Sequence, residues 1–418
     1  MQQQGKGPVA IIGAGIVGLC TAHALRRAGH AVTLFDPEAP GSPAQCSYGN
    51  AGALSSRSVA PLAMPGVLRS ALPMLLDARS PLHIPPRYWL RAAPWLARFA
   101  AAARPARVAA IARALDELLA GSVPAHAALA REVGVPELVR GGGQLHVYPD
   151  ARAYAADAAS WALKRRHGLR AEPVDAQAIR ELEPEVGRRY TTGVLLPDEG
   201  WLANPGRYAQ AIAAALRGQG VQIVPVRIQA LRQDAQGWSL AAAGRSWPAR
   251  QVVVCAGAWS RALLAPLGHE VPLESQRGYH LQAPDAGVAL SRLVVLGDRK
   301  VYLMPGEQGL RIAGTVEFGG LARAPNRRRA MLLAGHARAA LAHARLDGAQ
   351  MWMGHRPCLP DSLPVIGAVP GLPGLWCAFG HGHLGLTGSV NTGALIARAM
   401  AGHAAPQELA PFAIGRFA

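Results

Sequence analysis

Lysine is nearly absent from this sequence. Among its 43 basic residues only Lys6, Lys164 and Lys300 are lysines, and all the others are arginines. The formal net charge is +17, but no basic run is interleaved with aromatic residues as in nucleic-acid-binding surfaces. An arginine bias beside many alanines is typical of a GC-rich coding sequence. We therefore expect no nucleic-acid partner.

Cysteine is also scarce and follows no pairing pattern. The five cysteines form no CxxC pair and no spacing typical of a metal site, so we expect no metal. Unpaired cysteines are typical of a reducing compartment. The first residues lack the basic region and cleavage site of a secretory signal. We expect a cytoplasmic protein, with the inner face of the cell membrane as an alternative.

Charged residues are missing from one long stretch. From Ser362 to Ala397 there is no Asp, Glu, Lys or Arg, a length sufficient to span a bilayer. Pro364, Pro370 and Pro373 interrupt the stretch, together with several glycines, and such short pieces could not satisfy their own backbone in lipid. We interpret this stretch as buried core.

The N-terminal residues carry a dinucleotide-binding pattern. The strand-like run Val9–Ile12 leads into Gly13-Ala14-Gly15-Ile16-Val17-Gly18, a helical pattern follows, and a second strand-like run, Val32–Phe35, ends at Asp36. The three glycines permit a tight turn, close approach of a pyrophosphate and close packing of helix on strand. The helix N-terminus attracts the pyrophosphate, and Asp36 is placed to accept ribose hydroxyls. No second such motif exists for a nicotinamide nucleotide, which favours FAD as the resident dinucleotide.

Further motifs carry a resemblance to a known family. They follow one another as Ser47-Tyr48-Gly49-Asn50-Ala51-Gly52, Ala60–Val67, Ser80–Leu82, Leu196–Trp201, Asn204–Arg207, Arg277-Gly278-Tyr279, Ala313–Gly319, Arg356-Pro357 and Gly380–Gly385. With them, nearly the whole chain resembles the D-amino-acid oxidase-like family of FAD-dependent oxidoreductases, and within it the bacterial D-amino acid dehydrogenases. The resemblance implies a non-covalently bound FAD. Cys358 raises covalent attachment as an alternative, but the cysteine used by related sarcosine oxidases would fall near Gly354.

Pattern and resemblance together predict the cofactor-binding residues. These are Gly13, Ala14, Gly15, Ile16, Val17, Gly18, Asp36, Ser47, Asn50, Ala51, Gly52, Ile228, Ala256, Gly257, Gly382, His383, Leu384, Gly385, Leu386 and Thr387. Small residues at a strand end let a ligand approach the backbone. A helix beginning near Leu384 would stabilise negative charge on a reduced flavin with its N–H groups. His381 and His383 are ordinary loop histidines or direct catalytic groups.

Two residues are predicted to bind a substrate carboxylate. Arg356 lies in a segment poor in carboxylates, and its guanidinium fits a carboxylate bidentately. The resemblance implies this role for the arginine of the Gly-x-Arg-Pro motif, whereas an ion pair with Asp361 is the alternative. Tyr279 is a second candidate donor, or else a core tyrosine. Its neighbour His280 would face the opposite side of a regular strand.

We expect an α/β fold in which a Rossmann-type FAD-binding domain is interleaved with an α+β substrate domain on a mixed or antiparallel sheet. Residues 1–60, 185–270 and 345–418 are predicted to form the FAD-binding domain, and 61–184 and 271–344 the substrate-binding domain. Hydrophobic patterns predict helices over 87–103, 111–130, 208–217 and 330–344, and strands over 144–148, 221–224, 251–255 and 375–379.

The resemblance implies oxidative deamination of D-amino acids or cyclic imino acids, by hydride transfer from the α-carbon to flavin N5. Electrons would pass to a quinone or dye-like acceptor. The alternatives are an oxygen-using oxidase of glycine, sarcosine or D-amino acids, and a flavin-bearing subunit without activity of its own. Amphipathic stretches 62–76 and 88–103 fit either peripheral membrane contact or helix packing. The oligomeric state stays open.

Overall fold

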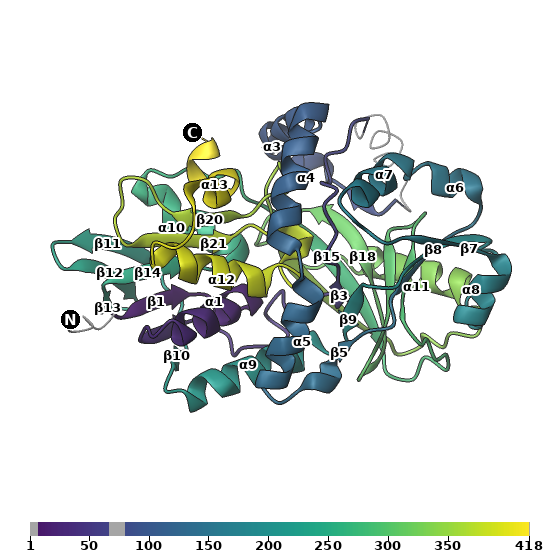
Figure 1. The fold of residues 1–418 in the computed structure, drawn as a ribbon, viewed down its shortest axis with the longest axis horizontal. Helices are drawn as coiled ribbons and strands as arrows, with labels where there is room; N and C mark the ends of the chain where they lie inside the picture. Colours follow the sequence, from purple (N-terminus) through teal and green to yellow (C-terminus); the bar gives the residue numbers. More distant parts are fainter. Residues whose placement is uncertain (1–6, 67–79, 418) are drawn as a thin grey trace.

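The computed structural model describes residues 7–66 and 80–417. Two large β-sheets form the two halves of an elongated molecule, and helices α4 (Pro105–Leu119) and α5 (Ser122–Glu132) lie between them (Figure 1). Three separate segments of the chain build the first half: one holds β1 and β2, one holds β10 and β14, and one holds β20 and β21. The colours in Figure 1 show this interleaving. No helix among the described residues is long and apolar enough to cross a membrane.

The first sheet is the dinucleotide-binding sheet. Its strands, in spatial order, are β10 (Gln222–Val224), β2 (Val32–Phe35), β1 (Val9–Ile12), β14 (Gln251–Val254), β21 (Leu375–Phe379) and β20 (Val365–Ala368). All neighbours are parallel except β20 and β21. Parallel strands buried on both faces are uniformly apolar, as β1 and β14 are.

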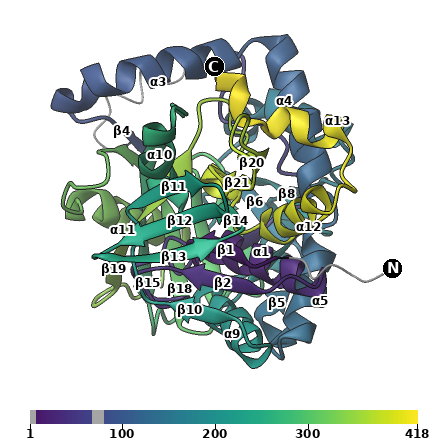
Figure 2. The same ribbon diagram turned by 90° about the vertical axis from the view of Figure 1, so that its left-hand side faces the viewer.

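Both faces of this sheet are covered. Helices α1 (Ile16–Arg27), α9 (Pro205–Gly218) and α12 (Ser389–Met400) share one hydrophobic core with it. On the other face lies a three-stranded antiparallel sheet of β11 (Ala230–Asp234), β12 (Gly237–Ala242) and β13 (Arg245–Ala249), seen in front in Figure 2. The charge-free stretch 362–397 supplies β20, β21 and most of α12, so its interpretation as core is confirmed.

The second sheet is mixed and larger. Its path runs through β19 (Gln350–Cys358), β15 (Glu274–Ala283), β18 (Gly309–Phe318), β17 (Val301–Gly306), β16 (Leu293–Leu296), β6 (Gln144–Tyr148), β8 (Thr192–Leu196) and β7 (Glu172–Asp175), with β4 (Leu82–His83) beside β18. Helix α11 (Arg327–Ala340) covers one face. The helices α6 (Ala151–Ala155) and α7 (Ala158–Arg166) pack near β6 and β8.

The predicted fold class is confirmed, and the predicted strands lie where expected to within a residue or two. The domain bounds differ, because β8 and β19 hydrogen-bond into the second sheet although residues 185–270 and 345–418 were assigned to the first. The single helix expected over 111–130 is two helices, since Gly121 adopts a left-handed φ of 68° between α4 and α5. Helix α3 (Trp89–Ala102) matches 88–103, whereas most of the other amphipathic stretch, from residue 67, lies outside the described residues.

Candidate active site

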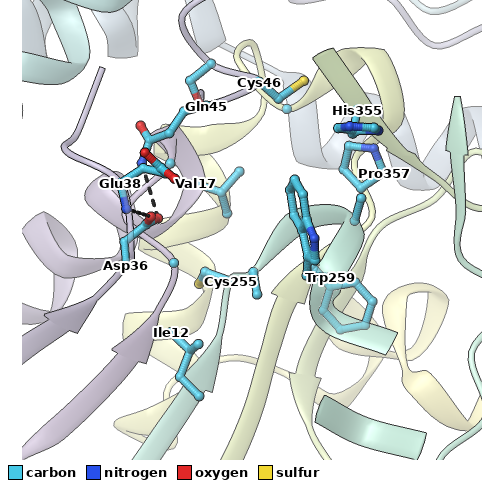
Figure 3. A pocket seen from close by; sticks show the side chains of 18 of the residues that line it. Ile12, Val17, Asp36, Glu38, Gln45, Cys46, Cys255, Trp259, His355 and Pro357 are labelled. Atoms are coloured by element: carbon cyan, nitrogen blue, oxygen red, sulfur yellow. Dashed lines mark hydrogen bonds between the residues drawn. The ribbon is translucent and has the colours of Figure 1, made fainter. Parts of the chain in front are cut away.

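A pocket opens at the carboxyl ends of the parallel strands β1, β2 and β14. It has a volume of about 460 Å³ and is lined by residues from the first sheet, from 44–50 and from the end of β19. Figure 3 shows Asp36 and Glu38 on one side and Trp259, His355 and Pro357 on the other. This is the edge at which open α/β sheets bind their ligands.

The glycine turn between β1 and α1 leaves no room for side chains. Gly13 has a φ of 109°, and a Cβ on it would lie 2.7 Å from the carbonyl carbon of Cys255. A Cβ on Gly18 would overlap the carbonyl oxygen of Gly13. Both glycines are therefore required by close approach of backbone to backbone, as the sequence pattern predicts.

The N-terminus of α1 fits the pyrophosphate of a dinucleotide. Its N-cap, Gly15, has no side chain of its own to cap the helix, and no acidic residue lies in its first turn. The backbone N–H of Ile16 donates to Ser47 Oγ over 2.9 Å, which places that hydroxyl at the helix end. Free N–H groups and the positive end of the helix dipole favour an anion here.

Asp36, the residue predicted to accept the ribose hydroxyls, directly follows β2. The backbone N–H groups of Ala14 and Glu38 donate to its carboxylate over 2.7 and 2.8 Å, and Gln45 donates from its side chain. Burial raises the pKa of Asp36, and these donors oppose that shift. The carboxylate is thus held at the pocket wall by three donors from the turn and the following loop.

Most of the predicted cofactor residues line this pocket. They are Gly13, Gly15, Ile16, Val17, Asp36, Ser47, Asn50, Ile228, Ala256, Gly257, Gly382, Gly385 and Leu386. The predicted residues outside the pocket lining are Ala14, Gly18, Ala51, Gly52, His383, Leu384 and Thr387. Of these, Ala14 and Gly18 shape the turn, and Gly52 has a φ of 77° and accepts from the backbone N–H of Leu202.

The segment 382–387 is arranged differently from the expectation. Gly382–Leu384 forms a 3₁₀ turn, and the helix α12 begins only at Ser389. His126 from α5, which the sequence does not single out, holds this segment. Its Nε2 lies 2.9 Å from the carbonyl oxygen of Leu386, and its Nδ1 lies 3.1 Å from the Tyr208 hydroxyl. Burial lowers the pKa of His126 to about 4, so the neutral ring donates from Nε2 to the carbonyl.

The two loop histidines differ in surroundings. His381 is buried, and its Nε2 lies 2.9 Å from the hydroxyl of Thr392 in α12, which is a structural contact. His383 remains exposed, yet burial by surrounding protein lowers its pKa to about 4, and the charges of Arg356 and Lys164 lower it further.

Cys358 is a poor nucleophile for covalent attachment. Its side chain is buried at the end of β19, and burial raises the pKa of the thiol to about 12. The thiolate, which is the reactive form, is therefore strongly disfavoured. This environment supports non-covalent binding of the cofactor.

Arg356 extends from β19 across the second sheet. Its Nη1 donates to the carbonyl oxygen of Thr315 over 2.8 Å, and its guanidinium lies against Gly278, where a Cβ would overlap it. Asp361 pairs with Arg416 instead, over 2.8 Å. Within the described part of the chain, no carboxylate forms an ion pair with Arg356. The alternative of a structural pair with Asp361 is therefore wrong.

A strained residue holds this arginine. Thr315 has a φ of 56°, which is rare for a β-branched side chain, at an irregularity in the pairing of β15 with β18. The extra residue there turns a carbonyl toward the guanidinium. Such strain is typical of positions that orient functional groups.

Tyr279 lies on the other face of the sheet. It belongs to the core beneath α11, its hydroxyl donates to Glu317, and the backbone N–H of Asn326 donates to it over 3.0 Å. Because its hydroxyl is engaged there, Tyr279 offers no donor beside Arg356, and we correct its role to a structural one. His280 does face the opposite side, where it stacks on Trp352.

Tyr302 faces the side of the sheet on which Tyr279 was expected. It lies on β17 between Val301 and Leu303, which both face α11, so its own side chain points to the face that carries Arg356. It is half-buried, burial raises its pKa, and the charge of Arg356 opposes that shift. The sequence could have revealed it only through the alternation of β17, because no motif marks it.

Fold and pocket together define a protein that binds an adenine dinucleotide on its first sheet and presents a second sheet to it. A family model described as FAD dependent oxidoreductase matches residues 8–399. The chain is 38% identical over 419 residues to a D-amino-acid oxidase of Bradyrhizobium diazoefficiens, with 98% of each chain covered. It is 32% identical over 430 residues to a D-amino acid dehydrogenase of Paramagnetospirillum magneticum, again with 98% of each covered.

The fold is also shared with solved structures. A glycine oxidase from Geobacillus kaustophilus matches with a TM-score of 0.73 at 23% identity, over 98% of this chain and 99% of that one. The chain belongs to the D-amino-acid oxidase family of FAD-dependent oxidoreductases, and FAD is its cofactor. The expected family, cofactor and enzyme class are confirmed.

Proposed function

We propose that this chain oxidatively deaminates D-amino acids or related cyclic imino acids. The observation that carries the proposal is the guanidinium of Arg356, which has no carboxylate partner among the described residues and lies in the chain between His355 and Pro357, two residues that line the pocket. A guanidinium removed from bulk water is stabilised by an anion, and its planar donors fit a carboxylate. The names of the relatives, a D-amino-acid oxidase and a D-amino acid dehydrogenase, support the same substrate class.

The residues of the chain bind and orient the substrate. Arg356, held by the Thr315 carbonyl, would donate to the substrate carboxylate, and the Tyr302 hydroxyl would be a second donor to that carboxylate. Neutral His383 adds no charge there. The bound FAD supplies the acceptor for the hydride that leaves the α-carbon. With a primary amino acid the resulting imine is hydrolysed by water to a 2-oxo acid and ammonia, whereas a cyclic imino acid gives a cyclic imine that keeps its nitrogen.

We assign no general base to this reaction. The substrate amine must be neutral before its α-hydrogen leaves as hydride, and orientation of that C–H bond can supply most of the acceleration. The apolar and neutral groups near Arg356 favour a neutral amine over an ammonium, because a second positive charge would be repelled.

The substitution Arg356→Ala tests the role of the arginine. Loss of two charge-assisted hydrogen bonds, together about 3 kcal/mol, should raise KM for D-amino acids by about 100-fold. FAD content should stay at the wild-type level, because Arg356 does not line the cofactor pocket. Arg345→Ala, at an exposed pair with Asp285, is the matched control and should change neither quantity. An unchanged KM in Arg356→Ala would refute the assignment.

We infer that a quinone or dye-like molecule accepts the electrons. Helix α3 supports contact with a membrane surface, since Leu90 is 92% exposed and Trp89 40% exposed on a helix along the edge of the molecule (Figure 2). An oxygen-using oxidase is the second candidate, favoured by the name of the relative at 38% identity. Hydrogen peroxide released in equal amount to the 2-oxo acid would establish the oxidase, and its absence the dehydrogenase.

A further inference from the structure

One face of the second sheet continues from Arg356 across β17, β16 and β6 to helix α7. Val295 on β16 is the register partner of both Tyr302 on β17 and His146 on β6. The residues directly before and after each of these three on its strand belong to the core under α11. Tyr302, Val295 and His146 therefore point together to the other face, in one row about 10 Å long.

Helix α7 ends this row. The ring of Trp161 lies edge-on to His146, with centroids 5.2 Å apart, and the Trp161 indole donates to the Tyr148 hydroxyl. The ammonium of Lys164, one turn further along α7, lies 4.9 Å from the centre of the Trp161 ring. The row thus runs from Tyr302, next to Arg356, to a lysine on the far side.

Lys164 has no ionic partner within the part of the chain that the structure describes. Of the nearby carboxylates, Asp157 pairs with Lys300, and Glu199 accepts from the backbone N–H groups of Ser56 and Arg57. Burial, followed by the charge of Lys300, lowers the pKa of Lys164 to about 8. At neutral pH the side chain is still mostly charged, and an ammonium in such surroundings is stabilised by an anion.

Arg356 and Lys164 lie toward the two ends of this row. The charges of both act on the imidazole of His383, which is exposed. Two cations without ionic partners among the described residues are therefore presented on one face of the second sheet. A substrate with one carboxylate satisfies only one of them.

We propose that Lys164 binds a second carboxylate on the substrate, so that the preferred substrates are D-amino acids with an acidic side chain. The proposal rests on the proposed function, in which Arg356 binds the α-carboxylate. A dicarboxylic amino acid places one negative charge against each cation. Its uncharged amide analogue leaves the Lys164 ammonium without an anion, and a site built for a charged partner discriminates strongly against such an analogue.

The test compares D-glutamate with D-glutamine, which differ little in shape. We expect kcat/KM to be at least 10-fold higher for D-glutamate in the wild-type holoenzyme, and this ratio to fall about 10-fold or more in Lys164→Met. Lys164→Arg keeps the positive charge and should retain most of the preference. Arg166→Met is the matched control, because it removes an exposed positive charge from the same helix, and its ratio should stay near the wild-type value.

The outcomes separate this proposal from the proposed function. Oxidation of both substrates with equal kcat/KM, or a ratio that Lys164→Met leaves unchanged, would overturn the role of Lys164 while D-amino acid oxidation stands. If neither substrate, nor any other D-amino acid, is oxidised, the proposed function fails and this proposal with it. FAD content, measured by visible absorbance, shows that each variant is folded.

Discussion

The substitution Gly278→Ala should displace Arg356 without touching it chemically. A Cβ at position 278 would overlap Cζ, Nη1 and Nη2 of the guanidinium, which lies flat against the glycine. To restore an ordinary contact of about 3.5 Å the guanidinium must move by more than about 1 Å. A displacement of that size at a group that orients the substrate costs on the order of 100-fold. We therefore expect kcat/KM for D-amino acids to fall by about 100-fold.

Steady-state kinetics of the FAD-loaded variant measure this effect. FAD content should stay normal, since Gly278 does not line the cofactor pocket. The matched control is Gly335→Ala on α11, where an added Cβ meets no atom within 4 Å. In that exposed helical position alanine should stabilise the fold by about 0.5–1 kcal/mol and leave kcat/KM unchanged. If Gly278→Ala keeps wild-type kcat/KM, Arg356 does not need its observed position, and our account of substrate binding is wrong.

Two further predictions concern the cofactor and pH. Asp36→Asn should weaken FAD binding by about 10-fold or more, because a charged acceptor for the ribose is lost. Titration of the apoprotein with FAD measures this affinity. Glu270→Gln, at an exposed pair with Arg261, is the control, and equal affinity of the two variants for FAD would contradict the role of Asp36. The D-glutamate to D-glutamine ratio of kcat/KM should fall as pH rises through about 8, where Lys164 loses its proton. The ratio cancels the titration of the substrate amine, and a ratio constant from pH 7 to 9.5 would argue against a charged Lys164. The charged and titratable groups that face Lys164 are Lys300, Asp157, Glu199, His146 and His383.

The dinucleotide half of the molecule was predictable because its constraints are local. Gly13, Gly18 and Asp36 act within one strand, turn and strand; the two glycines make the close backbone contacts that the spacing predicts, and Asp36 lies at the pocket wall. The same holds for the uniformly apolar strands β1 and β14, which need no distant partner to be recognised.

The substrate side depends on contacts between distant segments, and there the sequence was a weaker guide. Tyr279 and Tyr302 are both strand tyrosines, and only the packing of α11 decides which one faces Arg356. Likewise His126 reaches the 386–387 carbonyls from a helix more than two hundred residues earlier. The domain bounds failed for the same reason, because β8 and β19 are assigned by their hydrogen-bonded neighbours rather than by their own residues.

The central claim is that FAD on the first sheet accepts electrons from an amino acid held by the second. Anaerobic mixing of the purified yellow holoenzyme with a panel of D-, L- and N-methyl amino acids and prolines tests it most directly. We predict that the visible flavin absorbance bleaches with D-amino acids or cyclic imino acids, fastest with those that carry an acidic side chain, in the isolated chain without a partner subunit. Flavin that stays oxidised with every member of the panel would contradict the account.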